Sequence, residues 1–338
     1  MCSIQTKLNL KPFTTMAIDV KATNYVEINS VKDLQLFLNT SYKKPLYILG
    51  GGSNIVFLQD YSGTVLHMHN LGKEVVGKSD NIVLIKANAG ENWHEFVLWT
   101  LSKGFGGLEN LSLIPGWVGA SPMQNIGAYG REIKDVFHEL EAVEVATGKI
   151  RTFTHEDCQF GYRESVFKNE LKGQYIISSV TFKLTIQHHE LNTNYGAIQD
   201  ELLAMNVINP TINDVSNAVI AIRKSKLPDP KKIPNCGSFF KNPTILKEQY
   251  FLLKQDYPEI PGYVVSETHI KVPAGWLIDY AGWKGYRNDT VGVHDKQALV
   301  LINHHHGSGQ DILKLSNDIM LDIEAKFGIK LEREVNMI

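Results

Sequence analysis

Apolar residues at helical spacing predict helices in four parts of the chain. Ser30 is a plausible N-cap for the first run, and Gly104 ends the second. In the third run Thr211 or Asn213 could be the cap, and the prolines after Leu227 stop the helix. The predicted helices span residues 30–38, 92–101, 211–226 and 309–327.

Shorter runs rich in β-branched and aromatic residues predict strands between these helices. Residues 187–195 interrupt the pattern and predict a loop or crossover, whereas the glycine-rich residues 105–130 predict an ordered loop. We find no internal repeat and no low-complexity tract. The predicted strands span residues 45–49, 55–58, 82–90, 140–152, 175–186, 263–271, 298–303 and 330–335.

The most informative break between strands is the loop Gly50-Gly51-Gly52-Ser53-Asn54. Glycines allow positive φ and a close approach of the backbone to a ligand. Successive backbone N–H groups in such a turn can hold an anion such as a pyrophosphate. A plain turn at the end of a strand would have a similar sequence, so the loop alone leaves both interpretations open.

This loop does not match the two common nucleotide-binding motifs. Ile55 stands where the dinucleotide fingerprint needs its third glycine, and no Lys-Ser or Lys-Thr follows at the spacing of a P-loop. Residues 55–58 predict a strand, so the loop is expected to join strand to strand.

Length and composition exclude several classes of protein. The 338 residues, 43 % of them apolar, fit two or three globular domains, and a net charge of −2 argues against binding nucleic acid by bulk phosphate attraction. Cys2, Cys158 and Cys236 are too few for a disulfide framework or a zinc site, and residues 304–306, all histidine, favour a solvated turn over a metal site. Without an apolar signal-peptide core or a membrane-spanning run, we expect a cytoplasmic protein.

Residues 111–130 alternate small turn-forming residues with bulky apolar residues. Such a segment can lay its backbone against a planar ligand, and a buried structural loop is the alternative. Arg163 lies among aromatic and apolar neighbours and therefore needs an anionic partner. That partner could be a ligand or the carboxylate of Glu164 or Asp157.

Ser238 follows Gly237 where a strand is expected to begin, but the sequence is not the G-x-S-x-G of a hydrolase. Cys236 is a rival nucleophile, although nothing near it in the sequence lowers its pKa. Near the end of the chain, Glu332 and Glu334 would share one face of the last predicted strand. Two exposed surface glutamates are the alternative there.

Taken together, these blocks resemble one family, the flavin-dependent UDP-N-acetylenolpyruvoylglucosamine reductases of bacterial peptidoglycan synthesis and cell wall biogenesis. The resemblance extends over nearly the whole chain. It rests on the order of the motifs LGGGSN, ENLSLIPGWVGASPMQNIGAYG, FGYRES, KLPDP, GSFFKNP, AGWLID, HDKQALVLIN and LEREV.

The resemblance implies an α+β fold. It predicts a two-subdomain FAD-binding unit of the PCMH/vanillyl-alcohol-oxidase-like type, followed by a separate α+β substrate-binding domain. On this basis residues 1–70 and 71–205 are the two FAD-binding subdomains, and residues 206–338 are the C-terminal domain. Tyr195 matches a tyrosine loop of the longer, type I members, with a surface tyrosine at a turn as the alternative.

The implied reaction reduces UDP-N-acetylglucosamine enolpyruvate to UDP-N-acetylmuramate through FAD, with NADPH as co-substrate. Hydride would come from flavin N5 and a proton from a serine. The resemblance further implies no metal, no nucleic-acid partner, no membrane insertion and a monomer. The residues expected to contact FAD are Gly50, Gly51, Gly52, Ser53, Asn54, Pro115, Gly116, Ser121, Asn125, Ile126 and Gly127.

Residue by residue, the matching motifs assign catalytic roles to Arg163, Ser238 and Glu334. Arg163 would hold the substrate carboxylate and developing enolate, Ser238 would donate the proton, and Glu334 would complete the polar cluster. Substrate-binding roles fall on Tyr162, Tyr195, Lys226, Asn242, Tyr263, Lys284 and Gln297.

Two other functions stay open from the sequence. A flavin oxidase of the wider fold superfamily would consume oxygen rapidly, and would not act on the enolpyruvyl ether. A non-catalytic nucleotide-binding protein would bind ligand without turnover.

Overall fold

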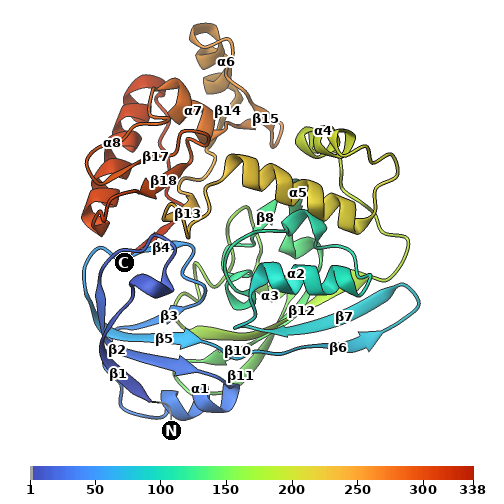
Figure 1. Cartoon of the computed structure of the whole chain (residues 1–338), viewed down its shortest axis with the longest axis vertical. Coiled ribbons are helices and arrows are strands. Elements are labelled where there is room, and N and C mark those ends of the chain that lie inside the picture. The colour runs from blue at the N-terminus through green and yellow to red at the C-terminus, as the bar shows by residue number, and fades with distance from the viewer. Residues whose placement is uncertain (1–2) are drawn as a thin grey trace. The chain divides into compact units, whose positions relative to one another are not determined.

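The structure, a computed structural model, describes residues 3–338, so Met1 and Cys2 lie outside it. The chain forms two compact units (Figure 1). Among the described residues, unit 1 comprises residues 3–8, 22–51 and 62–225, and unit 2 comprises residues 9–21, 52–61 and 226–338. The glycine-rich loop is therefore divided: Gly50 and Gly51 belong to unit 1, and Gly52, Ser53 and Asn54 belong to unit 2.

Unit 1 contains two larger sheets and the two-stranded antiparallel sheet β8-β9. The strand order is β1-β2-β5-β3 in the first, where β3 and β5 run parallel, and β11-β10-β12-β7-β6 in the second, where neighbours are antiparallel. The elements are β1 (Ile4–Asn9), β2 (Lys21–Ile28), α1 (Val31–Leu38), β3 (Leu46–Leu49), β5 (Tyr61–Met68), β6 (Lys73–Lys78), β7 (Ile82–Asn88), α2 (Trp93–Ser102), β8 (Gly127–Ala128), β9 (Arg131–Glu132), β10 (Phe137–Glu144), β11 (Ile150–Thr154), α3 (His155–Cys158), β12 (Tyr175–Thr185), α4 (Gly196–Ala204) and α5 (Ile212–Lys226).

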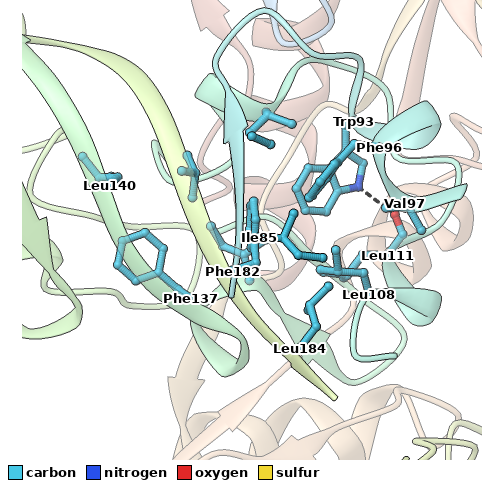
Figure 2. Close-up of a cluster of buried hydrophobic side chains, with 14 of the residues drawn as sticks. Ile85, Trp93, Phe96, Val97, Leu108, Leu111, Phe137, Leu140, Phe182 and Leu184 are labelled. Carbon is cyan, nitrogen blue, oxygen red and sulfur yellow. Dashed lines mark hydrogen bonds between the residues drawn. The ribbon is translucent and has the colours of Figure 1, made fainter. Parts of the chain in front are cut away.

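The main core of unit 1 lies between α2 and the second sheet. Figure 2 shows Trp93 and Phe96 of α2 beside Ile85 of β7 and Phe182 of β12, all of them buried. The indole Nε1 of Trp93 donates a hydrogen bond to the carbonyl oxygen of Leu111 at 2.9 Å. This bond satisfies the buried N–H and anchors the start of the 111–130 segment to the core.

Unit 2 is built from three small sheets and the helices α6, α7 and α8. The strand orders are β13-β18-β17, β14-β16-β15 and β19-β4, and in the last of these the two strands run parallel. The elements are β4 (Ile55–Val56), β13 (Asn235–Ser238), β14 (Thr244–Leu246), α6 (Lys247–Asp256), β15 (Tyr263–Val264), β16 (His269–Lys271), α7 (Ala274–Tyr280), β17 (Val291–Val293), β18 (Val300–Asn303), α8 (Gly309–Phe327) and β19 (Asn336–Met337).

The four predicted helices are confirmed as α1, α2, α5 and α8. Their starts have the expected caps: Ser30 accepts from the backbone N–H of Asp33, and Asn92 accepts from that of Glu95. At α5 the hydroxyl of Thr211 accepts from the N–H of Asp214, so Thr211 rather than Asn213 is the cap. The predicted strand–loop–strand arrangement around residues 50–54 is also confirmed, by β3 and β4.

Three strand predictions are wrong in detail. Residues 140–152 form parts of two antiparallel strands, β10 and β11, with a turn at Gly148. Residues 263–271 likewise form two short paired strands, β15 and β16. Residues 330–335 are not a strand: only Arg333 makes an isolated bridge, to Phe240, and regular pairing starts at Asn336. Apolar periodicity marked these segments as extended but could not reveal where a pairing partner begins and ends.

Candidate functional site

The two segments predicted to contact FAD meet within unit 1. A Cβ atom added to Gly51 would lie 2.9 Å from the Cα of Gly116 and 3.1 Å from the Cδ1 of Trp117. Real Cβ atoms do not come this close, so the two backbones can meet in this way only because residue 51 is glycine. The sequence predicted each loop separately, and the structure brings them together.

Hydrogen bonds fix the second segment to the turn between β7 and α2. The N–H of Val118 donates to the carbonyl of Glu91, and the N–H of Gly119 donates to that of Ala89. A Cβ on Gly119 would lie 2.5 Å from the Cβ of Ala89, so glycine is required for this contact. Ser121, a predicted FAD contact, is buried, and its hydroxyl donates to the carbonyl of Val118. The Ser121 side chain is therefore directed into the segment itself.

Asn125 joins the 115–127 segment to the block around Arg163. It is fully buried with φ +44°, and its amide donates to the Glu132 carboxylate and to the carbonyl of Gly161. Asparagine tolerates this left-handed backbone better than most residues. The predicted residues Asn125, Ile126 and Gly127 therefore help to fix the conformation of the 115–127 segment.

Arg163 is held against the same segment. Its Nη2 donates to the carbonyl of Gly127 at 2.9 Å, and its guanidinium lies 5.5 Å from the ring centre of Tyr162. Its backbone has φ +57°, a sparsely populated conformation for a residue with a side chain. Asp157, one carboxylate considered for Arg163, instead caps α3 and pairs with Arg151.

The sequence did not single out Arg223, which lies on α5 near Arg163. Its Nε donates to the carbonyl of Leu113 at 3.2 Å, and its side chain is hydrogen-bonded to Tyr129. Burial lowers the pKa of Arg223, and the charge of Arg163 lowers it further. Two arginines this close to each other favour the binding of an anion beside them. The position of Arg223 in the helical pattern gave no sign that this charged residue would be buried.

Tyr129 and Tyr195 complete this part of unit 1. Their rings make an edge-to-face contact with centroids 5.4 Å apart, and burial raises the pKa of Tyr129. Tyr195 immediately precedes α4 and is half exposed. The structure thus gathers Tyr162, Arg163 and Tyr195, three of the predicted residues, in unit 1 with Arg223.

In unit 2, Ser238 ends strand β13 rather than beginning it, so that detail of the prediction is wrong. The register of β13 against β18 is irregular between Asn235 and Ser238, and Gly237 has φ +70°. This bulge re-aims the following side chain. Ser238 is exposed, whereas Phe239 and Phe240 after it are buried.

The neighbouring thiol is unsuited to act as a nucleophile. Cys236 is buried, its Sγ donates to the carbonyl of Ile55, and burial raises its pKa to about 12. A thiol with this pKa carries almost no thiolate at neutral pH. Between the two nucleophile candidates, the structure favours the exposed hydroxyl of Ser238.

Glu334 lies beside the Ser238 segment within unit 2. Its N–H donates to the carbonyl of Phe239 at 2.9 Å, and its carbonyl accepts from the side-chain amide of Asn54. One patch of unit 2 therefore contains a residue of the glycine-rich loop and two predicted catalytic residues. The carboxylate of Glu332 instead forms an ion pair with Lys241 at 2.6 Å, so we do not count Glu332 among the candidate catalytic residues.

The remaining predicted substrate residues also belong to unit 2. The Asn242 side chain accepts from the first N–H of α7, and Lys284 pairs with Asp279 at 2.6 Å. Tyr263 is exposed on β15. Lys226 is exposed at the end of α5, and Gln297 is half-buried before β18. The structure does not bring these five side chains into mutual contact in any hydrogen bond or ion pair that it records.

The loop residues fit a dinucleotide cofactor. Gly52 has φ +60°, and a Cβ there would lie 1.9 Å from the Phe13 carbonyl oxygen, so the turn requires glycine. A glycine turn of this kind directs backbone N–H groups toward a bound phosphate. Among residues 3–338, no group of three or more His, Cys, Asp or Glu side chains is arranged to hold a metal ion. Over the same range, no helix is long and apolar enough to cross a membrane.

Comparisons with known proteins identify the family to which the chain is similar. Residues 229–338 match the family model of the UDP-N-acetylenolpyruvoylglucosamine reductase C-terminal domain, and residues 22–154 match an FAD binding domain. The chain is 50 % identical to the UDP-N-acetylenolpyruvoylglucosamine reductase of Flavobacterium johnsoniae over 99 % of both chains. It is 43 % identical to that of Pseudomonas aeruginosa, over 99 % of this chain and 98 % of the relative.

A solved structure has the same fold. The UDP-N-acetylenolpyruvylglucosamine reductase of Thermus caldophilus superposes with a TM-score of 0.70, covering 100 % of this chain and 99 % of its own. At 20 % identity this likeness concerns the fold. Together with the FAD-binding match, it confirms the predicted α+β fold with an FAD-binding domain of the PCMH type.

Proposed function

This chain belongs to the UDP-N-acetylenolpyruvoylglucosamine reductase family, and from that premise we propose how its residues perform the reaction. The protein reduces UDP-N-acetylglucosamine enolpyruvate to UDP-N-acetylmuramate in the synthesis of peptidoglycan precursors, with FAD as cofactor and NADPH as co-substrate. The observation that carries the residue assignments is the contact of the 50–54 loop with the 115–127 segment, to which Arg163 is hydrogen-bonded.

When bound, FAD would supply the redox chemistry, the transfer of hydride from NADPH to the vinyl carbon of the substrate through flavin N5. The 50–54 loop would hold the pyrophosphate through backbone N–H groups. The 115–127 segment, from Pro115 and Gly116 to Gly127, would face the rest of the cofactor with its backbone, because Ser121 and Asn125 use their side chains internally.

Arg163 would bind the carboxylate of the enolpyruvyl group. Hydride addition leaves negative charge at the carbon that bears this carboxylate, and a planar guanidinium can bind the delocalised charge with two parallel hydrogen bonds. The left-handed backbone and the Gly127 contact hold the guanidinium in place before substrate arrives. Arg223 would add a second positive charge for the anionic substrate.

Ser238 would deliver the proton to the same carbon, which completes the addition of hydride and proton across the double bond. A serine hydroxyl is a weak acid, so it needs a polar neighbour when it donates. Glu334, which lies one backbone hydrogen bond from Phe239, is our candidate for that neighbour.

Tyr162, Tyr195, Lys226, Asn242, Tyr263, Lys284 and Gln297 are our candidates for binding the rest of the substrate. We also propose the domain division at residues 70 and 205, a monomeric state and a cytoplasmic location. The cytoplasmic location is supported by the need for a nucleotide sugar and NADPH.

The test of this function follows the visible spectrum of the purified protein under anaerobic conditions. We expect a yellow protein whose flavin absorbance NADPH bleaches and UDP-N-acetylglucosamine enolpyruvate restores. A correctly folded, colourless protein that ignores added FAD would contradict the function. Rapid reoxidation by oxygen, with no response to the enolpyruvyl ether, would instead support the flavin oxidase.

Ser238→Ala should separate the two half-reactions. Because the hydroxyl is needed only for protonation, reduction by NADPH should stay normal, while reoxidation by substrate should slow by about 10²- to 10⁴-fold. Rapid-mixing spectroscopy measures both rates. Cys236→Ala, which removes the adjacent thiol, is the matched control and should retain both half-reactions. Equal losses in the two halves for Ser238→Ala would refute its assigned role.

A further inference from the structure

The imidazole of His67 lies directly against the first of the two candidate FAD loops. His67 is 3 % exposed on β5 and stands opposite Leu49, the last residue of β3. Its Nε2 is 3.0 Å from the carbonyl oxygen of Gly50, and its Nδ1 is 2.6 Å from the hydroxyl of Tyr25 on β2. A carbonyl oxygen can only accept, so Nε2 carries the proton and Nδ1 accepts from Tyr25. A chain of hydrogen bonds thus runs from Tyr25 through His67 to Gly50.

The same imidazole contacts the second FAD loop. The indole of Trp117, which follows Gly116, stacks on the His67 ring with centroids 4.6 Å apart and planes 1° from parallel. The ring of His69 meets both of them edge-on, 4.4 Å from His67 and 4.7 Å from Trp117. His67 therefore joins the two loops, by a hydrogen bond to one and by stacking on the other.

The hydrogen bond to Gly50 determines where the next amide points. In a planar trans peptide the C=O of one residue and the N–H of the next point in opposite directions. Because the Gly50 carbonyl points toward His67 inside the unit, the N–H of Gly51 points away from His67. Backbone N–H groups of a glycine turn are the donors that bind a phosphate anion.

We propose that His67 is a positioning residue of the FAD site, which holds the Gly50 carbonyl and the Trp117 ring so that the Gly51 N–H is preset to bind the cofactor pyrophosphate. This inference rests on the proposed function, since it requires that the 50–54 loop binds FAD. None of the motifs that carry the family resemblance contains His67, which lies between two of them in the sequence.

The two hydrogen bonds fit a neutral imidazole with its proton on Nε2. A second proton would reverse the hydrogen bond between Nδ1 and Tyr25, while Nε2–H would still donate to Gly50. Burial, with a smaller contribution from His69, lowers the pKa of His67 to about 4, and burial raises the pKa of Tyr25 to about 12. Glu27 on β2 also raises the pKa of Tyr25. The chain of hydrogen bonds from Tyr25 through His67 to Gly50 is therefore intact across the neutral range.

The first test measures FAD affinity by fluorescence titration of the apoprotein, in the wild type and three variants. His67→Leu removes the side-chain donor that holds the Gly50 carbonyl, so we expect binding roughly 10- to 100-fold weaker. In His67→Gln the side-chain Nε2 can still donate to Gly50, so most of the affinity should return. The control, His69→Leu, loses only ring contacts and should change the affinity by less than about threefold.

The second test uses pH. Burial is the main cause of the lowered pKa of His67, so FAD affinity should stay level as the pH falls through about 6.5, the ordinary pKa of histidine. A fall in affinity centred near pH 6.5 that is absent in His67→Gln would show an imidazole open to solvent protons and would overturn the buried positioning role.

The outcomes separate this inference from the proposed function. Wild-type protein that binds no FAD would refute the function itself. Wild-type protein that binds FAD, with His67→Leu equally tight or His67→Gln no better than His67→Leu, would overturn the positioning role. If His67→Leu does not fold, imidazole ¹⁵N shifts of the wild type decide: an Nε2–H tautomer that persists below pH 6 supports the role, and an Nδ1–H tautomer overturns it.

Discussion

At the residue scale, burial separates the groups that can react from those that cannot. Ser238 is exposed after a bulge, whereas Cys158 and Cys236 are enclosed and their thiol pKa values are raised to about 12 by burial. The same principle keeps His67 neutral. From the sequence alone these side chains look equally able to react. Only their packing in the fold gives them different chemistry.

The two buried thiols give a direct prediction. At pH 8 iodoacetamide should leave Cys158 and Cys236 unmodified in the native protein, because the thiolate is the reactive form. In urea both should react, since unfolding returns the pKa to its ordinary value. Peptide mass spectrometry reads each site. Alkylation of native Cys236 at the rate of a free thiol would revive it as a candidate nucleophile.

Arg163→Lys tests whether the planar fork matters beyond its charge. Lysine keeps the positive charge but cannot make two parallel hydrogen bonds to a carboxylate. We expect reoxidation by substrate to slow roughly 10- to 100-fold, with reduction by NADPH unchanged. Arg151→Lys, at the exposed pair with Asp157, is the control and should behave as the wild type. Full activity in Arg163→Lys would remove the proposed carboxylate contact.

At the element scale, neighbouring glycines of the 50–54 loop differ in how strictly the fold requires them. A Cβ on Gly51 would clash with the Gly116 backbone at 2.9 Å, whereas a Cβ on Gly50 would make ordinary contacts, the nearest at 3.8 Å. Gly51→Ala should therefore separate the loops, weakening FAD binding and costing about 1–3 kcal/mol of stability.

Gly196→Ala is the control, with the same added atom outside the two loops, because a Cβ on Gly196 would meet no atom within 4 Å. It should bind FAD within a few-fold of the wild type. Flavin fluorescence and urea denaturation measure the two quantities. A Gly51→Ala protein with unchanged affinity and stability would show that the loops need not touch.

The elements also show how far the sequence alone could go. Helices α1, α2 and α8 were predictable because each combines an apolar face with a side-chain cap, such as Ser308 on α8. Helix α6 was not predicted, since its N-terminus has no side-chain cap and Phe251 and Leu252 face solvent. The strand predicted at 330–335 failed because one bridge, at Arg333, replaces regular pairing.

At the scale of the whole molecule, the predicted site residues are divided between the two units. Arg163 and Tyr195 belong to unit 1, and Ser238 and Glu334 belong to unit 2. Motif order singled out these four candidates, because each lies in a short block of sequence that can be matched on its own. It could not point to Arg223 or His67, because the roles that we propose for them depend on neighbours that folding brings to them.

The central claim is that Arg163, Ser238 and Glu334 act on one enolpyruvyl group. A crystal structure of the protein with FAD and substrate bound tests this most directly. We predict the guanidinium of Arg163 at the substrate carboxylate, and the hydroxyl of Ser238 within about 3 Å of the carbon to be protonated or linked to it by one water. The carboxylate of Glu334 should lie in the same cluster. Substrate bound with any of the three side chains turned away from the enolpyruvyl group would contradict the account.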